Sequence, residues 1–221
     1  MKIFCDLDGT IIDSSKRHVL LLERLLKDNE IRYAKEQLAL YMPCKAGGKG
    51  TRAFLTDILG LDSRNAAQIA EKWAENIENA EYLRYDLLYD DSIAALSAMR
   101  EMGDVFFLTA RKNGKGLYHT MERLGIDRYA RCVFVVSPYH ATDNKYEAVR
   151  AIVSHDDILI GDTEADLNAA GRLGISCYML NRGFRSEAYW REINVKSYDG
   201  LLEVLDSIQS NNVKGKEGVF K

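Results

Sequence analysis

Five short apolar runs, separated by segments of helical periodicity, constrain the fold of this 221-residue chain most strongly. The runs cover residues 1–7, 105–108, 133–136, 158–160 and 177–180. The segments that repeat apolar residues every three or four positions cover residues 92–102, 115–124, 145–152, 164–173 and 200–208. Strands that alternate with helices predict an α/β fold, here a Rossmann-like, doubly wound parallel sheet. In such a sheet the ligand crevice lies beyond the carboxyl ends of the strands.

The rhythm changes between residue 12 and about residue 86, where helical patterns occur without a convincing strand. Segments 16–29, 34–41, 51–59 and 66–82 each carry an apolar face, which favours a small helical bundle. We therefore predict an α/β core from residues 1–12 and 87–210, with an inserted α-helical cap domain from residues 13–86. The polar segment 211–221 is predicted to be a flexible C-terminal tail.

Composition and charge exclude several classes of function. A formal charge of -3 gives no broad positive field, which argues against a nucleic-acid polymer as partner. The four cysteines form no Cys-x-x-Cys pair, so a zinc or disulfide scaffold is not expected. Charges recur too often for a membrane-spanning run, and the strand-like start leaves no room for a leader. We expect a cytoplasmic protein that acts on a small phosphorylated metabolite; the sequence leaves its oligomeric state open.

Two pairs of aspartates follow predicted strands. Asp6 and Asp8 are two residues apart, so they leave an extended strand on the same side. Asp162 follows the run 158–160, and Asp166 falls in the first turn of the next helix. Each can instead be a turn or helix-capping residue. Together they would concentrate negative charge at one sheet edge, and Mg²⁺ is the hard cation that best suits a few carboxylates beside a phosphate.

Two further residues join these aspartates in a recognisable order. Thr109 ends a predicted strand and Lys145 opens a helical segment, although alone they read as a capping residue and a surface charge. With the aspartates they resemble the four motifs of the haloacid dehalogenase superfamily, over residues 1 to about 181. The motifs are here Asp6-Leu7-Asp8-Gly9-Thr10, Phe107-Leu108-Thr109, Lys145 and Gly161-Asp162-Thr163-Glu164-Ala165-Asp166.

The resemblance implies a catalytic role for four residues. Asp6 would attack phosphorus and form an aspartyl-phosphate, which divides the hydrolysis into two displacements. Asp8 would give a proton to the leaving oxygen and later take one from water. Thr109 and Lys145 would bind the non-bridging phosphoryl oxygens.

The resemblance also implies a magnesium site and a phosphate-facing turn. Mg²⁺ would be held by Asp6, the backbone carbonyl of Asp8 and Asp162, with Asp166 joining through a water or supporting the site. Gly9 would let the backbone turn so that amides face the phosphate.

The residues after Thr109 depart from the family pattern. Many members that resemble this chain carry a small polar residue there, whereas this chain has Ala110 and Arg111. We expect Ala110 beside Thr109 at the substrate-binding edge. Arg111 either reaches a second anionic group or is an exposed, solvated side chain, and it is not placed in the catalytic set.

The insertion resembles the helical cap of phosphoglycolate-phosphatase-like and phosphoglucomutase-like relatives, which closes over substrate. Its segment 43–52 combines three basic residues with three glycines. Lys45, Lys49 and Arg52 are therefore candidates to contact the non-reacting part of an anionic substrate. The same composition also suits a mobile surface turn.

These observations predict a Mg²⁺-dependent phosphatase that hydrolyses a small organic phosphate monoester through an aspartyl-phosphate on Asp6. An alternative is a sugar-phosphate mutase of the same fold, similar to beta-phosphoglucomutase, which would return the phosphoryl group to its substrate. A non-enzymatic phosphoacceptor signalling module is a further alternative, and the inserted cap argues against it.

Overall fold

A central sheet of six parallel strands forms the core of the protein, of which this computed structural model describes residues 1–217. The strand order is β5-β4-β1-β6-β7-β8. The strands are β1 (Lys2–Cys5), β4 (Asp104–Ala110), β5 (Cys132–Val136), β6 (Ile158–Gly161), β7 (Ser176–Leu180) and β8 (Ser197–Tyr198). The predicted doubly wound parallel α/β sheet is confirmed. Strand β8 was not predicted, because two residues make no apolar run.

Helices cover both faces of this sheet, so its strands are buried on both sides. One face packs against α7 (Ser92–Met102), α8 (Gly114–Leu124) and α12 (Leu201–Glu217), and the other against α9 (Ala141–Val149) and α10 (Glu164–Leu173). Ile3 and Cys5 contribute to the first core cluster, while Phe4 contributes to the second. This alternation is the two-residue period of a strand. It explains why the first strand reads as a continuous apolar run.

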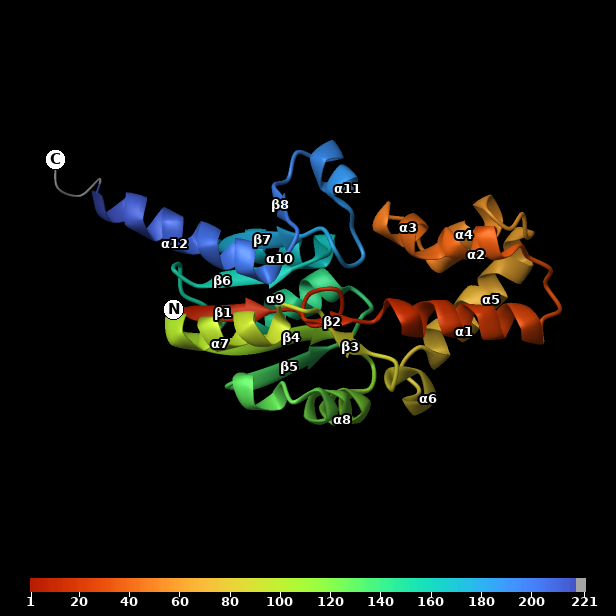
Figure 1. Ribbon diagram of the computed structural model, residues 1–221, viewed down its shortest axis with the longest axis horizontal. Helices are drawn as coiled ribbons and strands as arrows, with labels where there is room; N and C mark the ends of the chain where they lie inside the picture. The colour runs from red at the N-terminus through yellow and green to blue at the C-terminus, as the bar shows by residue number, and fades with distance from the viewer. Residues whose placement is uncertain (218–221) are drawn as a thin grey trace.

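Six helices lie between β1 and α7 and form a separate bundle beyond the carboxyl ends of the strands (Figure 1). They are α1 (Ser15–Asp28), α2 (Lys35–Ala39), α3 (Tyr41–Ala46), α4 (Thr51–Asp57), α5 (Ser63–Asn76) and α6 (Ala80–Leu83). The bundle has its own apolar cluster, with Leu22, Tyr41 and Phe54 at its centre. The single helix predicted at 66–82 is two helices, because the chain turns between Asn76 and Ala80.

A two-stranded ribbon joins the bundle to the core. Strand β2 (Ile12–Asp13) pairs antiparallel with β3 (Leu87–Leu88), and Ile12 faces Leu88. The chain therefore enters and leaves the helical insertion side by side. The boundaries that we predicted for the cap, residues 13 and 86, fall at this ribbon.

The C-terminal part of the chain differs in detail from the prediction. A short helix, α11 (Glu187–Glu192), and a 3₁₀ turn, η1 (Asp127–Tyr129), were not predicted. Helix α12 continues to Glu217, so the predicted tail at 211–221 begins within this helix, and its last four residues lie outside the described residues. Among residues 1–217, no helix is both long and apolar enough to cross a membrane.

Candidate active site

Three aspartates meet beyond the carboxyl ends of β1 and β6. Asp6 follows β1, Asp162 follows β6 and Asp166 lies in the first turn of α10. One carboxylate oxygen from each lies within 4.8 Å of the others. The amide of Asp6 donates a hydrogen bond to Ile160 O at 2.9 Å, which fixes β1 against β6 at this point. We call these three residues the acidic centre.

Lys145 pairs with two of the carboxylates of the acidic centre. Its Nζ lies 2.8 Å from Asp6 Oδ1 and 2.5 Å from Asp166 Oδ1, and its side chain is buried. Burial alone would disfavour the ammonium, but Asp166 and Asp6 raise the pKa of Lys145 above its ordinary value. Lys145 therefore stays charged and orients Asp6 from α9. The structure brings it to Asp6 as the motif order predicted.

The acidic centre carries more negative charge than Lys145 can neutralise. Burial, followed by the charges of Asp6 and Asp166, raises the pKa of Asp162 well above its usual range. Burial likewise raises the pKa of Asp6 to about 7, even with Lys145 beside it. Asp162 Oδ1 is buried, and it has no hydrogen-bond partner among the residues whose side chains are described. Three clustered carboxylates, one with a free oxygen, are a donor set that fits a hard divalent cation.

Gly9 is required for the close packing of the first loop on Asp162. Its φ is +81°, and a Cβ at this position would lie 2.1 Å from Asp162 Oδ2. A side chain is therefore excluded on both conformational and steric grounds. The Gly9 amide donates to Ile12 O at 2.8 Å, so in this structure Gly9 contributes close packing and its own N–H is already paired.

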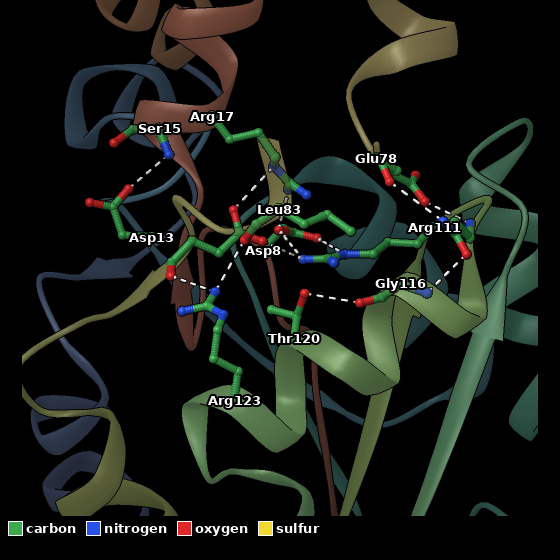
Figure 2. A network of polar contacts seen from close by, with 12 residues as sticks. Asp8, Asp13, Ser15, Arg17, Glu78, Leu83, Arg111, Gly116, Thr120 and Arg123 are labelled. Carbon is green, nitrogen blue, oxygen red and sulfur yellow. Dashed lines mark hydrogen bonds and ion pairs between the residues drawn. The ribbon is translucent and has the colours of Figure 1, made fainter. Parts of the chain in front are cut away.

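Asp8 lies apart from the acidic centre and accepts hydrogen bonds from two buried arginines (Figure 2). Arg17 NH2 donates to Asp8 Oδ1 at 2.6 Å, and Arg111 donates through Nε and NH2 at 2.6 and 2.7 Å. Burial acts to raise the pKa of Asp8, but Arg111 and Arg17 outweigh it and hold that pKa well below its usual range. Arg111 is 3% exposed, so its reading as a solvated surface residue is wrong.

Asp86 completes this network from the end of the helical insertion. Its carboxylate lies 3.2 Å from Arg17 Nε and 3.3 Å from Arg111 NH2. Arg123, from α8, donates to the backbone carbonyls of Leu83 and Asp86 (Figure 2). The two arginines and two aspartates thus neutralise one another, and they tie the insertion to the core at Asp8.

Sequence reasoning missed Arg17 and Asp86, and one signal for Arg17 was present. Arg17 stands four residues before Leu21 and eight before Leu25, on the apolar face of α1. A charged residue that continues an apolar stripe must be paired when the stripe is buried. Asp86 follows no strand and belongs to no motif, so no local pattern marked it.

Thr109 and Ala110 end β4 next to the Asp6 loop. Phe107 pairs with Cys5, which places Thr109 two residues further along, beside the segment that carries Asp6. Thr109 is buried, and Ala110 lines a cavity of about 320 Å³ that Asp8 also lines. Both residues therefore lie where the sequence predicted, at the carboxyl edge of the sheet.

The three basic residues of segment 43–52 have different surroundings. Lys45 lies in α3, which covers residues 43–46 of this segment, and its Nζ lies 4.4 Å from the centre of the Trp73 ring. Lys49 is exposed and its Nζ lies 2.9 Å from Asp57. Arg52 is exposed on α4. Lys45 and Lys49 both line a cavity to which Phe184 of the core also contributes.

A loop after β7, which no motif marked, connects the acidic centre to the helical insertion. The Phe184 amide donates to Asp162 Oδ2 at 2.6 Å, and the Phe184 ring stacks on His18 with centroids 4.8 Å apart. Gly183 also packs on Asp162, where a Cβ would lie 2.1 Å from Oδ2. A glycine three residues after the last predicted strand run was the available signal for this loop.

A cluster of carboxylates and one lysine at the carboxyl edge of a doubly wound sheet is typical of α/β enzymes that act on anionic ligands. The family model of the haloacid dehalogenase-like hydrolases matches residues 3–180. The chain belongs to this family, and it is a hydrolase of the haloacid dehalogenase type. No curated protein matches it.

Solved structures with the same fold cover almost the whole chain. A haloacid dehalogenase-like hydrolase from Streptococcus pneumoniae is 21% identical, with a TM-score of 0.71 over 94% of this chain and 97% of its own. A candidate phosphoglycolate phosphatase from Lactobacillus delbrueckii subsp. bulgaricus is 15% identical, with a TM-score of 0.62 over 94% and 97%. A candidate haloacid dehalogenase hydrolase from Bacillus subtilis, bound to magnesium, is 17% identical, with a TM-score of 0.60 over 88% and 98%.

Proposed function

We propose that this hydrolase is a Mg²⁺-dependent phosphatase that releases inorganic phosphate from a small organic phosphate monoester through an aspartyl-phosphate on Asp6. The observation that carries this proposal is the acidic centre, where Asp6 lies beside Asp162 and Asp166 and accepts a hydrogen bond from Lys145. Asp6 therefore has the Lys145 ammonium as a hydrogen-bond partner and two further carboxylates beside it, an arrangement that favours binding of a divalent cation.

The residues that would hold Mg²⁺ are Asp6, Asp162 and the backbone carbonyl of Asp8, with Asp166 acting through a water or as a support. The free Oδ1 of Asp162 and the excess of carboxylates over ammonium groups support this assignment, as does the magnesium in the relative from Bacillus subtilis. When bound, the ion supplies charge neutralisation for the phosphoryl oxygens.

In the proposed reaction Asp6 attacks phosphorus, the bond to the leaving oxygen breaks, and Asp8 donates a proton to that oxygen. Asp8 then takes a proton from the water that attacks the aspartyl-phosphate, and Asp6 and inorganic phosphate are released. Lys145 and Thr109 would bind the non-bridging oxygens. Arg111 and Arg17 keep Asp8 ionised in this structure, so its role as a proton donor requires that its pKa rise when substrate is bound. Because Arg17 belongs to the helical insertion, a movement of that insertion would free Asp8 from one of its two arginine partners and let its pKa rise.

The test of the proposed function is phosphate release from a panel of small phosphate monoesters, with Mg²⁺ or with a chelator. We expect release from at least one member that requires Mg²⁺ and stops on chelation. Isomerisation of a sugar phosphate without net phosphate release would favour the mutase alternative instead. A folded, Mg²⁺-loaded protein that releases no phosphate from any ester would overturn the proposal.

Mg²⁺ is expected to stabilise the protein against heat. At a free concentration of about 100 times Kd, a ligand that binds only the folded state adds about 2.7 kcal/mol, or about 5–10 °C in Tm for a chain of this size. We expect this rise for the unmodified protein and a much smaller one for Asp162→Asn, which removes a charge from the proposed site. Equal rises in the two proteins, measured by calorimetry, would exclude Asp162 as a ligand.

A further inference from the structure

The cleft between the helical insertion and the core contains an ammonium group without a counterion. Within residues 1–210, whose side chains are described, no ion pair includes Lys45. Its Nζ instead faces aromatic rings, at 4.4 Å from the centre of Trp73, 5.5 Å from Tyr41 and 5.6 Å from Phe184. Aromatic faces attract a cation but do not neutralise it. The charge of Lys45 is therefore available to a ligand.

The other basic groups near Lys45 are already paired. Arg185 Nε lies 2.7 Å from Glu164, and Lys49 Nζ lies 2.9 Å from Asp57. Lys45 is thus distinguished from Lys49, its neighbour in the same basic segment, by the absence of a carboxylate partner.

His18 adds a second group without a partner at the same place. Its side chain is buried, and within residues 1–210 its Nδ1 has no hydrogen-bond partner. The ring is fixed between Trp73 and Phe184, with centroids 4.9 and 4.8 Å away. A buried polar atom without a partner is uncommon in a folded protein, and a ligand group is one way to satisfy it. We call Lys45 and His18 the Lys45 subsite.

The Lys45 subsite shares lining residues with the space next to Asp8. One cavity of about 320 Å³ is lined by Asp8, Ala110 and His18. A second cavity of about 280 Å³ is lined by His18, Lys45 and Lys49, of which Lys49 is paired with Asp57. His18 and Phe184 line both. Cavities of this size hold a small metabolite. A leaving group that departs past Asp8 would therefore extend toward Lys45.

We propose that the Lys45 subsite binds a second anionic group, a carboxylate or a second phosphate, on the alcohol part of the substrate. The preferred substrates are then small phosphate monoesters with an anionic leaving group. This inference rests on the proposed function, which it extends from phosphate monoesters in general to this class.

A matched pair of esters tests the substrate class. 3-Phosphoglycerate and glycerol 3-phosphate share a three-carbon skeleton and differ in a carboxylate in place of a hydroxymethyl group. We expect the unmodified protein to favour 3-phosphoglycerate in kcat/KM by about tenfold or more, since a hydrogen bond to a charged group is worth about 10–150-fold. Lys45→Met is expected to lower the ratio of the two kcat/KM values by about 10–100-fold. Both values come from the same protein sample, so the ratio does not depend on how much of the variant folds.

Further variants separate a binding role from a structural one. Lys45→Arg restores part of the ratio because the charge returns, and His18→Phe lowers the ratio while it keeps the aromatic stack. Lys16→Met is the matched control: Lys16 is an exposed lysine of α1 whose Nζ lies 5.2 Å from the Tyr85 ring, outside the cleft. We expect its ratio to equal that of the unmodified protein.

The possible outcomes distinguish this inference from the proposed function. Hydrolysis of both esters without preference, or a ratio that Lys45→Met leaves unchanged, overturns the Lys45 subsite and leaves the phosphatase intact. No Mg²⁺-dependent hydrolysis of any phosphate ester overturns the proposed function itself.

The preference for the anionic ester is expected to depend on pH. Burial, followed by the charges of Arg185 and Arg17, lowers the pKa of Lys45 to about 8. Lys45 is charged below this pH and neutral above it, so the kcat/KM ratio falls as pH rises through about 8, because kcat/KM reports the free enzyme. Lys45→Arg keeps its charge throughout and should give a flat ratio.

The other titratable groups that face Lys45 do not produce this change. Burial raises the pKa of Cys44 above its usual value and lowers the pKa of His18 well below its usual value. Glu164 pairs with Arg185. Burial acts to raise the pKa of Glu164, but the hydrogen bond from Arg185 outweighs it and lowers that pKa. A ratio that stays constant between pH 7 and pH 9 would contradict the assignment.

Discussion

Replacing Asp6 by asparagine is expected to lower kcat for phosphate release by about 10⁴-fold or more, the scale seen when a catalytic nucleophile is removed. The amide has nearly the size of the carboxylate and still accepts a hydrogen bond from Lys145, but it does not attack phosphorus. Steady-state phosphate release in Mg²⁺ measures the loss. Intact-protein mass spectrometry during turnover should show a phosphoryl adduct on the unmodified protein and none on the variant.

The fold should survive this change, because Asp6→Asn removes one of three mutually repelling buried carboxylates. Its Tm without metal is therefore expected to equal or exceed that of the unmodified protein. Asp13→Asn is the matched control, because the Asp13 carboxylate accepts a hydrogen bond from the Ser15 amide, outside the acidic centre (Figure 2). If Asp6→Asn kept activity within tenfold of the unmodified protein, Asp6 would not be the nucleophile.

Lys145→Met is expected to have the second largest effect, on activity and stability together. The change leaves the three carboxylates of the acidic centre buried with no ammonium beside them, and loss of one partner of a buried pair costs about 3–5 kcal/mol. Activity should fall by about 10²–10³-fold, the scale for one group that stabilises transition-state charge. Urea unfolding in chelator at pH 7.5 measures the stability loss, and Mg²⁺ should recover part of it.

Lys2→Met provides the comparison for this variant. Lys2 pairs with Asp157 at 3.3 Å, at the opposite end of β1, and its side chain is 29% exposed. Asp157 is buried, but it also accepts hydrogen bonds from the Lys2 and Ser154 amides, so it keeps partners when the Lys2 ammonium is removed and the stability loss should be smaller than for Lys145→Met. A stability loss for Lys145→Met no greater than that for Lys2→Met would show that Lys145 does not neutralise the acidic centre.

The acidic centre could be predicted from sequence because each of its members stands at a fixed offset from an apolar strand. Parallel strands bring their carboxyl ends to one edge, so Asp6 and Asp162 converge without knowledge of the strand order. Lys145 was assigned to the same site only through the order of the family motifs. The two short strands of the ribbon and β8 could not be predicted in the same way, because a strand of two residues is too short to show an apolar pattern.

The pairing of Arg17 and Arg111 with Asp8 could not be predicted from the sequence. Arg111 and Asp8 are 103 residues apart, and their pairing depends on the relative placement of β1, β4 and α1. For the same reason sequence did not separate Lys45 from Lys49: the two differ in what lies opposite them, Trp73 for one and Asp57 for the other. Composition identified the basic segment, and tertiary contacts decide which of its charges is free.

The ribbon of β2 and β3 has a consequence for how this protein can diversify. Its two strands bring the chain back to the point where it left the core. With respect to the sheet, the intervening residues are therefore a closed loop. The entropy of closing a loop changes by only about 0.6 kcal/mol for each doubling of its length. Changes in most of residues 14–86, Lys45 included, can therefore leave the core sheet intact. Residues of the insertion that bond to the core are more constrained. Arg17 and Asp86 belong to the network at Asp8, and Glu78 accepts hydrogen bonds from the Lys112 and Asn113 amides.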